Sequence, residues 1–492
     1  MRADTWNEIL SPGDVITDTH ILDAWAAEQG FISGARPACV LKPSSVAQVQ
    51  DIVVRANAER IPIIPCSSSG PHFRGDTAPE VDDAVIVDLG GMDKILRMDV
   101  RNKVAMIEPG VTFDSLQKAA HQAGLRLPMP LAPRRTKSVI ASILEREPHT
   151  IPKYHWDSSD PMCCIEVVFG TGDLFRTGSA AGPGTLEQQW ASGQAQKSPM
   201  GPSQTDFMKI MQGSQGTLGI VTWATVKLEL KPTAQKAFFV SGTRLEDLID
   251  FTYAILRPKL PDECLILNAV ALASIMTPGL RERDALAKDL PNWVLCYAVS
   301  GYEHYPQERI SYIEADIDDL ARRHNVHPRT GLKDIAGLKF LARLSKSSDD
   351  PYWKIRHLGG CQDIFFLTTL DRAPGFLSAF EGERDRLAFP AENVAVYLQP
   401  TQQGRNLHVE FACMYNPEDA ESKARARDLY LNASRKMGDL GGFFSRPYGY
   451  WADVAYAKCP DTVKALHKVK GILDPQGIMN PGKLCFKKGV SV

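Results

Sequence analysis

Apolar and polar positions alternate in blocks along the first part of the chain, and the blocks have the lengths of strands and helices. Residues 39–41 are a short apolar run, which predicts a buried strand. Between Val46 and Ala56 the apolar residues recur at the i, i+3, i+4 spacing of one helix face, and either Ser44 or Ser45 can cap this helix. The apolar run of residues 61–65 predicts a second strand. Strand, helix and strand in this order indicate an α/β unit within a mixed α+β fold.

The same pattern continues after this unit. Residues 84–89 and 104–111 are further apolar runs, which we expect to be strands. Residues 113–123 have helical spacing and are followed by Gly124, the residue type preferred after a helix. Residues 178–205 are rich in Gly, Ser, Pro and Gln without periodicity, so we expect a long loop there.

Two stretches of small residues interrupt the pattern and are candidate ligand loops. In the first, the candidate cofactor-binding residues are Pro65, Ser67, Ser68, Ser69, Gly70, His72 and Gly75. In the second, the candidates are Gly213, Gly216, Thr217, Gly219, Ile220 and Val221. Small residues let backbone N–H groups approach a phosphate or a flat ring closely. Taken alone, each stretch is also compatible with an ordinary turn that binds no ligand.

The middle of the chain, residues 233–440, alternates predicted strands and helices without another phosphate loop. The strand predicted at residues 394–398 leads into an extended segment that carries His408 and Glu410. Residues two apart on an extended chain point to the same face. This pair could orient a substrate, accept a proton or ligate a metal. A hydrogen-bonded pair at a sheet edge is the alternative interpretation.

Composition excludes several classes of protein. The chain has 492 residues, of which 44% are hydrophobic and 23% charged, so we expect two or three globular domains. The net charge of −2 gives no reason to expect nucleic acid or an acidic membrane surface as a partner. The ten cysteines have neither zinc nor iron–sulfur spacing. Because the sequence shows no signal peptide and no apolar run of about 18 residues, we expect a cytoplasmic protein without a membrane span.

The order of motifs along the chain resembles the FAD-binding domain of the vanillyl-alcohol oxidase / p-cresol methylhydroxylase (PCMH-type) superfamily. The most specific match is residues 213–221, and residues 473–483 are similar to the C-terminal signature of the family. The other matching pieces are the loop after residues 61–65, Asp88-Leu89, Glu108-Pro109-Gly110-Val111, Ser138-Val139, Glu166-Val167-Val168, Gly172-Asp173 and Arg176-Thr177-Gly178. Single glycine patterns are weak signals, but a shared order of several motifs is strong evidence.

This resemblance implies a flavoprotein with FAD as its cofactor and two domains. Residues 1–232 would form the first part of a PCMH-type FAD-binding domain with two subdomains. Residues 233–440 would form an α/β cap domain for the substrate. Residues 441–492 would complete the FAD-binding domain.

The resemblance also implies which residues hold the cofactor. The first loop and Ser138 would hold the pyrophosphate, residues 213–221 would lie along the cofactor, and Lys483 of the C-terminal signature is a further candidate. Some relatives attach the flavin covalently through a histidine of the first loop. The spacing from His72 to Gly75 is shorter than in those relatives, so we expect non-covalent binding here.

The substrate site is suggested by a segment near the C-terminus. Arg446 followed by Asp453 is similar to the phenol-oxidising branch of the superfamily, where the arginine helps to hold a phenolate. Arg446 would be a fixed positive charge beside the flavin ring. That branch usually has a tyrosine directly before the arginine, where this chain has Ser445, and Tyr448 and Tyr450 are nearby candidates. Core packing is the alternative interpretation of these aromatic residues.

A sister group, the flavin-linked 2-hydroxy-acid dehydrogenases, has a similar Gly-x-Asn-Leu-His segment in which histidines and a glutamate are metal ligands. In this chain Thr401 stands about where the upstream histidine of that group would fall. The later glutamate-histidine pair would fall near Pro447 and Tyr448. Because those ligand types are absent from the sequence, we predict no metal site.

The predicted function is that of an FAD-dependent oxidoreductase, which transfers a hydride to flavin from an alcohol or benzylic carbon of an aromatic alcohol or 4-alkylphenol. The catalytic candidates are Arg446, Tyr448, His408, Glu410 and Tyr450. Two alternatives are a 2-hydroxy-acid dehydrogenase and a flavoprotein subunit of an electron-transfer complex. The expected partners are a small-molecule substrate and either an electron-acceptor protein or oxygen, and a homo-oligomer is compatible with the sequence.

Overall fold

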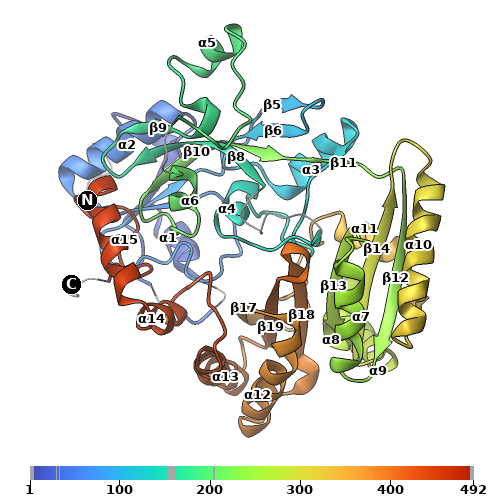
Figure 1. The fold of residues 1–492 in the computed structure, drawn as a ribbon. Coiled ribbons are helices and arrows are strands. Elements are labelled where there is room, and N and C mark those ends of the chain that lie inside the picture. Colours follow the sequence, from blue (N-terminus) through green and yellow to red (C-terminus); the bar gives the residue numbers. More distant parts are fainter. Residues whose placement is uncertain (1–4, 29, 33, 153–160, 203–205, 488–492) are drawn as a thin grey trace.

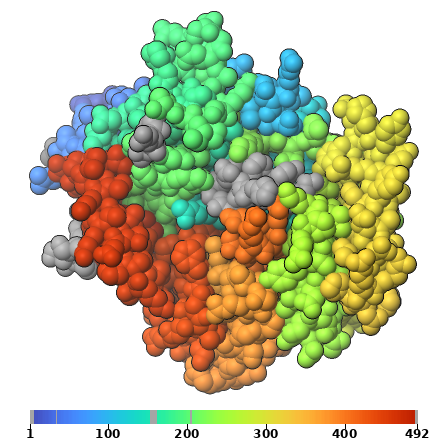
Figure 2. Space-filling view, in the orientation of Figure 1, coloured from blue at the N-terminus to red at the C-terminus, as the bar shows by residue number. Residues whose placement is uncertain are grey.

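Three large sheets with covering helices make up the protein. The computed structural model describes residues 5–28, 30–32, 34–152, 161–202 and 206–487. The mixture of sheets and helices confirms the predicted α+β class (Figure 1). In the space-filling view the end of the chain lies beside its beginning, and the middle of the chain forms the opposite side of the molecule (Figure 2).

The first sheet carries the serine-rich loop. Its strands stand in the order β1 (Val15–Ile16), β2 (Cys39–Leu41), β4 (Val85–Asp88) and β3 (Ile63–Cys66). Strands β2, β4 and β3 are parallel, and α2 (Val46–Glu59) connects β2 to β3. The Ser45 side chain caps α2 by accepting from the N–H of Gln48, which confirms the predicted start of this helix. The loop leaves the carboxyl end of a parallel strand, where open α/β sheets place their ligands.

The second sheet carries the glycine-rich stretch. Its strands are antiparallel and stand in the order β5 (Ile95–Asp99), β6 (Val104–Ile107), β10 (Gly219–Lys227), β8 (Met162–Phe169) and β9 (Leu174–Arg176). Three helices share the hydrophobic core of this sheet: α3 (Phe113–Gln122), α4 (Val139–Leu144) and α6 (Phe207–Met211). Residues 213–218 therefore form the turn that joins α6 to β10.

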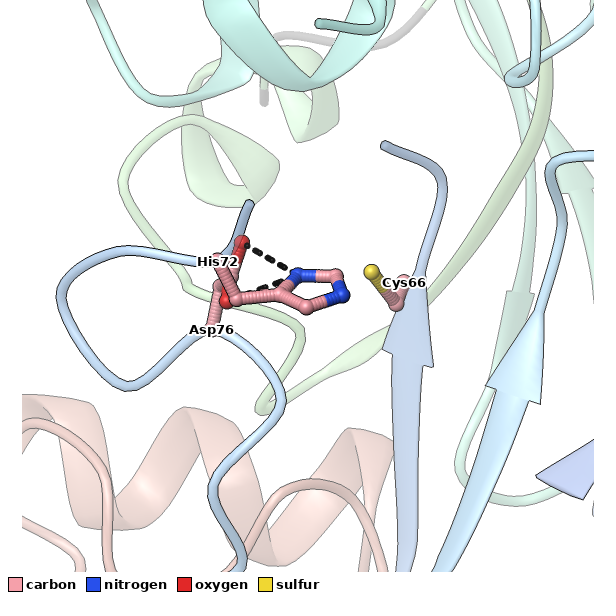
Figure 3. Close-up of side chains that lie close together, drawn as sticks. All are labelled: Cys66, His72 and Asp76. Carbon is pink, nitrogen blue, oxygen red and sulfur yellow. Dashed lines mark hydrogen bonds and ion pairs between the residues drawn. The ribbon is translucent and has the colours of Figure 1, made fainter. Parts of the chain in front are cut away.

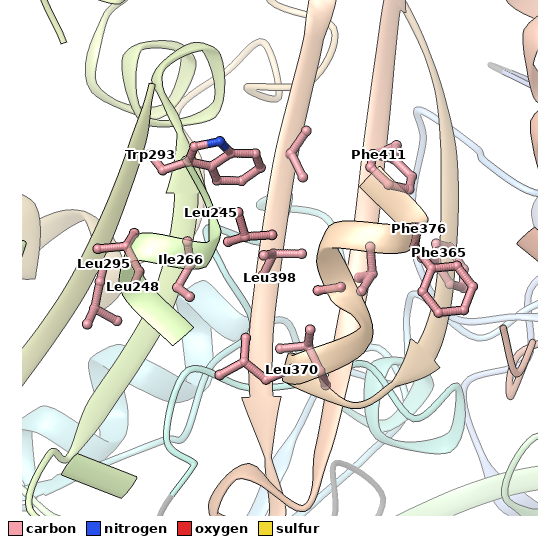
Figure 4. Close-up of a cluster of buried hydrophobic side chains, with 14 of the residues drawn as sticks. Leu245, Leu248, Ile266, Trp293, Leu295, Phe365, Leu370, Phe376, Leu398 and Phe411 are labelled. Carbon is pink, nitrogen blue, oxygen red and sulfur yellow. The ribbon is translucent and has the colours of Figure 1, made fainter. Parts of the chain in front are cut away.

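The third sheet lies in the middle part of the chain. Its antiparallel strands stand in the order β12 (Ala234–Gly242), β14 (Trp293–Gly301), β13 (Glu263–Asn268), β18 (Val394–Thr401), β19 (Asn406–Tyr415) and β17 (Gly360–Thr368). Neighbouring residues of a strand face opposite sides, so Phe238 and Phe239 pack into separate cores. Figure 4 shows the first core, where Leu248 of a covering helix and Leu398 of β18 lie in one cluster. The domain boundaries at residues 232 and 440 stay a prediction.

Helices cover both faces of the third sheet. The cores assign one face to α7 (Glu246–Leu256), α10 (Pro306–Arg323), α12 (Ala373–Arg386) and α13 (Ala420–Asp439), and the other face to α8 (Ala269–Met276) and α11 (Gly337–Leu344). The remaining long helices are α1 (Thr19–Ala26), α9 (Leu280–Asp289), α14 (Tyr450–Tyr456) and α15 (Pro460–Leu473). Within the described residues, none of the helices has the length and apolar character needed to cross a bilayer.

The stretch expected to be a long loop, residues 178–205, has some regular structure in its described part. It contains α5 (Leu186–Ala191), which begins with a capping box formed by Thr185 and Gln188. The hydrophobic periodicity is too short there to signal a helix, so the prediction missed it. The short elements elsewhere are β7 (Leu125–Arg126), β11 (Glu229–Leu230), β15 (Gly331–Leu332), β16 (Ile335–Ala336) and the 3-10 turns Pro12–Asp14, Gly178–Ala180, Leu370–Arg372, Ala391–Asn393 and Gln402–Gly404.

The C-terminal segment returns to the first two sheets. Met479 forms a parallel bridge with Ile63 of β3. The buried ammonium of Lys470 lies 2.6 Å from a carboxylate oxygen of Asp474 and donates to the carbonyl of Thr217 at 2.7 Å. The end of the chain is therefore fastened to the strand that carries the first ligand loop and to the turn that forms the second.

Candidate active site

Two adjoining cavities meet where the two ligand loops approach the third sheet. We call the first the groove, because it runs between the two ligand loops, and it has a volume of about 960 Å³. The second, which we call the inner cavity, has a volume of about 810 Å³ and reaches β17 and β19. The residues that line both spaces are Arg74, Asp76, Glu145, Arg446 and Tyr448. The two spaces therefore share a wall of mostly charged side chains.

The groove gathers most of the predicted cofactor-binding residues. Those that line it are Pro65, Ser67, Gly75, Gly213, Gly216, Gly219, Ile220, Val221 and Lys483. Gly216 has a φ of +70°, and a Cβ atom there would lie 2.6 Å from Cγ of Pro65. A larger residue would therefore be strained and would push the two loops apart. The glycine-rich stretch is thus built for close approach, as the sequence indicated.

The other predicted cofactor-binding residues line neither the groove nor the inner cavity, and their contact with the cofactor stays a prediction. They are Ser68, Ser69, Gly70, His72, Ser138 and Thr217. The N–H of Ser138 donates to Oγ of Ser68 at 3.0 Å, and the Ser138 hydroxyl donates to the carbonyl of Pro109 at 2.5 Å. The Thr217 hydroxyl donates to the carbonyl of Ser214 at 2.7 Å. These side chains hold the loops in shape because their polar atoms are used within the protein.

His72 does not line the groove. Figure 3 shows its ring between Cys66 and Asp76, and its Nδ1 lies 3.3 Å from Oδ1 of Asp76. The ring also stacks on Trp25, with 5.1 Å between the centroids. The Cys66 thiol donates to the carbonyl of Ser68 at 3.2 Å, and burial raises its pKa well above the ordinary value. Potential metal-ligand atoms of Cys66, His72 and Asp76 lie within 4.8 Å of one another. Because all three side chains are bonded within the loop, we interpret the cluster as a support for the shape of this loop.

Charged and aromatic side chains line the inner cavity. The cations are Arg74, Arg134, Lys137, Lys354 and Arg446, the carboxylates are Asp76, Glu145, Glu147, Asp363 and Glu410, and the aromatic rings are Phe73, Tyr352, Trp353, Tyr397 and Tyr448. Buried charges are costly unless they are paired. The pairing pattern therefore indicates which charge is left for a ligand.

Most of these charges are compensated within the protein. Arg74 lies 3.1 Å from Asp363 and 3.5 Å from Glu147, and Lys137 lies 2.7 Å from Glu145. Burial raises the pKa of Glu147, but Lys137 and Arg74 outweigh that effect and lower it to about 2. The loop after β3 is thereby tied to β17 through Arg74.

Arg446 is the exception. Its side chain is buried, at 4% exposure, and it forms no ion pair with a carboxylate of the described residues. Its guanidinium lies 3.8 Å from the ring centre of Phe365, and Nη2 lies 3.5 Å from Nδ1 of His408. Burial and the neighbouring Arg74 lower the pKa of Arg446, yet a guanidinium stays charged at ordinary pH. A buried cation without a described carboxylate at ion-pair distance is suited to bind an anionic ligand group.

His408 and Glu410 share a face of β19, which confirms that part of the sequence prediction. Both are buried and line the inner cavity, and Nε2 of His408 lies 3.3 Å from Oε2 of Glu410. The register places Phe365 of β17 and Tyr397 of β18 on either side of Glu410. Burial lowers the pKa of His408, which favours the neutral imidazole.

Comparison with known proteins decides the family. Residues 37–178 match the family described as "FAD binding domain", and residues 368–484 match "FAD linked oxidases, C-terminal domain". The chain belongs to the PCMH-type FAD-binding flavoprotein superfamily. It is an FAD-linked oxidoreductase, and FAD is its cofactor.

Relatives of this flavoprotein carry names that differ in substrate. It is 24% identical to D-2-hydroxyglutarate dehydrogenase of Stutzerimonas stutzeri over 98% of both chains. It is 30% identical to the flavoprotein subunit of 4-cresol dehydrogenase (hydroxylating) of Pseudomonas putida, over 49% of this chain and 44% of the relative. The solved structure of p-cresol methylhydroxylase with substrate bound has a TM-score of 0.84 at 19% identity, and the match covers 100% of this chain and 97% of that one. That likeness shows the fold.

The groove fits the FAD of this superfamily. Oδ1 of Asn480 is buried at the groove and has no hydrogen-bond partner among the described residues, so a bound group can supply one. Lys483 brings a positive charge to the same wall, where it also pairs with Glu80 at 3.0 Å. When bound, FAD supplies the redox chemistry, and the protein supplies orientation and charge.

The two candidate tyrosines have different positions. Tyr448 is buried and lines both the groove and the inner cavity, and burial raises the pKa of its hydroxyl well above the ordinary value. Tyr450 lines neither space, and its hydroxyl accepts from Nε of Arg435 at 3.2 Å. Tyr450 begins α14 and lies outside both spaces, so its catalytic role stays a prediction that the geometry does not support.

Sequence reasoning missed most charged residues of the inner cavity, and Arg74, Lys354 and Asp363 are examples. Arg74 had a usable signal, since it is a lone cation inside the first ligand loop. Lys354 and Asp363 had none, because their role depends on contacts with residues far away in the sequence, such as the bond from Arg74 to Asp363.

Proposed function

We propose that this flavoprotein oxidises a small substrate with an anionic group by removing a hydride from a hydroxyl-bearing or benzylic carbon. The substrate class that we favour is an aromatic alcohol or a 4-alkylphenol. The observation that carries the proposal is the buried Arg446, which lines both the groove and the inner cavity and lacks a carboxylate partner among the described residues.

Arg446 would anchor the substrate. Its guanidinium can donate two parallel hydrogen bonds to a carboxylate, or one charge-assisted bond to a phenolate oxygen. Holding one end of the substrate at the shared wall keeps the reacting carbon next to the groove, which lowers the entropic part of the barrier.

His408 and Tyr448 would handle the hydroxyl proton. The neutral imidazole of His408 can accept it, with Glu410 holding the ring in place. The phenol of Tyr448 stays protonated because burial raises its pKa, so it can donate a hydrogen bond to a substrate oxygen. Tyr450 is not part of this proposal.

The lining of the inner cavity supports an aromatic substrate. Five aromatic side chains line it, and flat rings favour stacked or edge-to-face contact with a flat ligand. An aliphatic acid of a few carbon atoms would leave most of that surface unused.

A 2-hydroxy acid is the second candidate. The chain is similar over nearly its whole length to a relative named D-2-hydroxyglutarate dehydrogenase. The carboxylate of a hydroxy acid would also satisfy Arg446. The two candidates differ in the ring surface that they require, so they can be separated experimentally.

The test is anaerobic mixing of the FAD-loaded protein with a panel of aromatic alcohols, 4-alkylphenols and 2-hydroxy acids. Loss of the visible flavin absorption with the aromatic compounds supports the proposal, and loss with hydroxy acids alone supports the second candidate. If no compound of either class reduces the flavin, the proposal is wrong. Reduction that requires an added acceptor protein would favour a subunit of an electron-transfer complex. The electron acceptor is then identified by testing whether oxygen or an added protein reoxidises the reduced flavin.

A further inference from the structure

A buried lysine stands beside the candidate base. Lys354 is 4% exposed, and its Nζ lies 2.8 Å from Oδ2 of Asp363 and 2.6 Å from Oε1 of Glu410. The lysine comes from the turn before β17, and the two carboxylates come from β17 and β19. Lysines are rarely buried to this degree unless they are paired. The ion pair with Glu410 links Lys354 to His408, the proposed acceptor of the substrate proton.

The neighbours of His408 determine which ring nitrogen carries its hydrogen. Glu410, as a carboxylate, can only accept, so Nε2 at 3.3 Å must be the donor. Arg446 can only donate, so Nδ1 at 3.5 Å must be the acceptor. The neutral ring therefore has its lone pair on Nδ1, next to the guanidinium proposed to bind the substrate.

The charges around His408 decide whether the ring stays neutral. Glu410 favours the protonated ring, while Arg446 and Lys354 disfavour it. The other side chains that pack on the ring are Phe365, at 5.8 Å, and Tyr397, at 5.7 Å between centroids, and both are uncharged. Without Lys354, the nearest cation able to balance the buried Glu410 carboxylate would be a protonated His408.

We propose that Lys354 is a positioning residue whose ammonium balances Glu410, so that His408 remains neutral with its lone pair on Nδ1. The Lys354 ammonium contacts Oε1 of Glu410, whereas the His408 ring contacts Oε2 of the same carboxylate. The orientation of the ring is then held by Glu410, and its charge state is held by Lys354.

The use of that lone pair rests on the proposed function. In the oxidation of an alcohol, the O–H bond breaks and its proton goes to Nδ1 of His408. The C–H bond breaks and its hydrogen leaves with the electron pair as a hydride, for which bound FAD would be the acceptor. The carbon is oxidised as the C=O bond forms. A protonated His408 could not accept the proton, so the reaction needs the state that Lys354 maintains.

The experiment measures the protonation of His408 directly, without a substrate. The FAD-loaded protein is labelled with ¹⁵N-histidine, and the ring nitrogen signals are followed by NMR between about pH 5 and pH 9. The His408 signals are assigned by their absence in His408→Gln. The variants are Lys354→Gln and Lys354→Arg, with the exposed Lys346→Met as control.

We expect the wild-type ring to titrate below the ordinary histidine pKa of about 6.5, with hydrogen on Nε2 in the neutral form. Lys354→Gln keeps a hydrogen-bonding side chain but removes the charge, so the His408 pKa should rise by about 1 to 2 units. Lys354→Arg should restore a low pKa, and Lys346→Met should match the wild type. Lys354→Met, tested in the same way, guards against a local effect of glutamine.

A folded, FAD-binding Lys354→Gln with an unchanged His408 pKa would overturn the proposal. So would a wild-type ring with its hydrogen on Nδ1. If these results agree with the proposal but no substrate is turned over, the proposed function fails while the role of Lys354 stands. Where turnover is found, the acid limb of its pH profile should move upward by the same 1 to 2 units in Lys354→Gln.

Discussion

The groove and the inner cavity are built in different ways. Apart from the wall that it shares with the inner cavity, the groove is lined largely by small and apolar residues, many of them from two stretches that are each continuous in sequence, around Pro65 and around Gly216. The inner cavity uses long charged side chains from segments far apart in the chain, such as Arg74, Asp363 and Arg446. The groove is therefore defined by local chain geometry, and the inner cavity by tertiary pairing of charges.

This difference determines how each space responds to substitution of its residues. A site made of backbone and glycine can serve the same cofactor in many relatives, because it depends little on individual side chains. A site made of paired charges can change its ligand when one partner changes, since each unpaired buried charge calls for a new counter-charge. Substitutions in one space should therefore leave the other largely intact.

The largest expected effect concerns the inner cavity. Arg446→Met should lower kcat/KM for the substrate by roughly 10³-fold, because it removes the cation that anchors the anionic group. The flavin content should stay at the wild-type level, since the groove keeps its glycines and Lys483. Steady-state kinetics and the flavin-to-protein absorbance ratio measure the two quantities.

The matched control for Arg446 is Arg435→Met. Arg435 is exposed, and its Nε contacts the hydroxyl of Tyr450, outside both cavities. It should change kcat/KM by less than about twofold. Loss of flavin in Arg446→Met, or unchanged kinetics, would break the separation of the two spaces.

The next effect concerns the groove. Gly216→Ala should weaken FAD binding by roughly 30- to 100-fold, because its Cβ would lie 2.6 Å from Pro65 at a φ of +70°. Gly124→Ala is the control, since Gly124 has a φ of +73° with no atom within 4 Å of the added Cβ. It carries the same backbone strain without the clash. Fluorescence titration of the apoprotein with FAD measures both, and equal losses in the two variants would show that the clash is unimportant.

The local origin of the groove explains why much of it could be predicted from sequence. Strand β3, the Ser45 cap and the turn before β10 depend on residues close together in the chain, and their patterns were visible. The roles of the loop serines stay a prediction, because sequence cannot say whether a hydroxyl faces a ligand or a backbone group. Ser68 accepts from the N–H of Ser138, 70 residues away.

The inner cavity could be predicted only in part. His408 and Glu410 were found because two residues on one strand obey a simple alternation. Lys354 was not found, because its partners lie on β17 and β19 and no local pattern marks a buried lysine. Tyr450 was chosen for its nearness in sequence to Arg446, but it begins α14 and lines neither cavity.

A smaller effect on FAD binding is expected for a residue that holds the first ligand loop in shape without lining the groove. Ser68→Ala removes the acceptor for the N–H of Ser138, and an unsatisfied buried N–H costs about 1 kcal/mol or more. FAD binding should weaken by about fivefold, because the first loop loses its tie to α4. The neighbouring Ser69 is exposed and lines neither cavity, so Ser69→Ala should bind FAD as the wild type does. Equal effects of the two substitutions in the same titration would contradict this distinction.

The smallest expected effect is at His72. Covalent attachment to a flavin would require a ring nitrogen that faces the groove, but Nδ1 faces Asp76 and the ring lies against Cys66 and Trp25. Acid precipitation should therefore release all of the flavin into the supernatant, for the wild type and for His72→Ala alike. The variant should lose only stability, by about 1 to 2 kcal/mol, as the stacked ring is removed. A yellow pellet from the wild type and a colourless one from His72→Ala would show that the loop turns this ring toward the flavin. The first ligand loop would then be less completely defined by its local geometry than the rest of the groove.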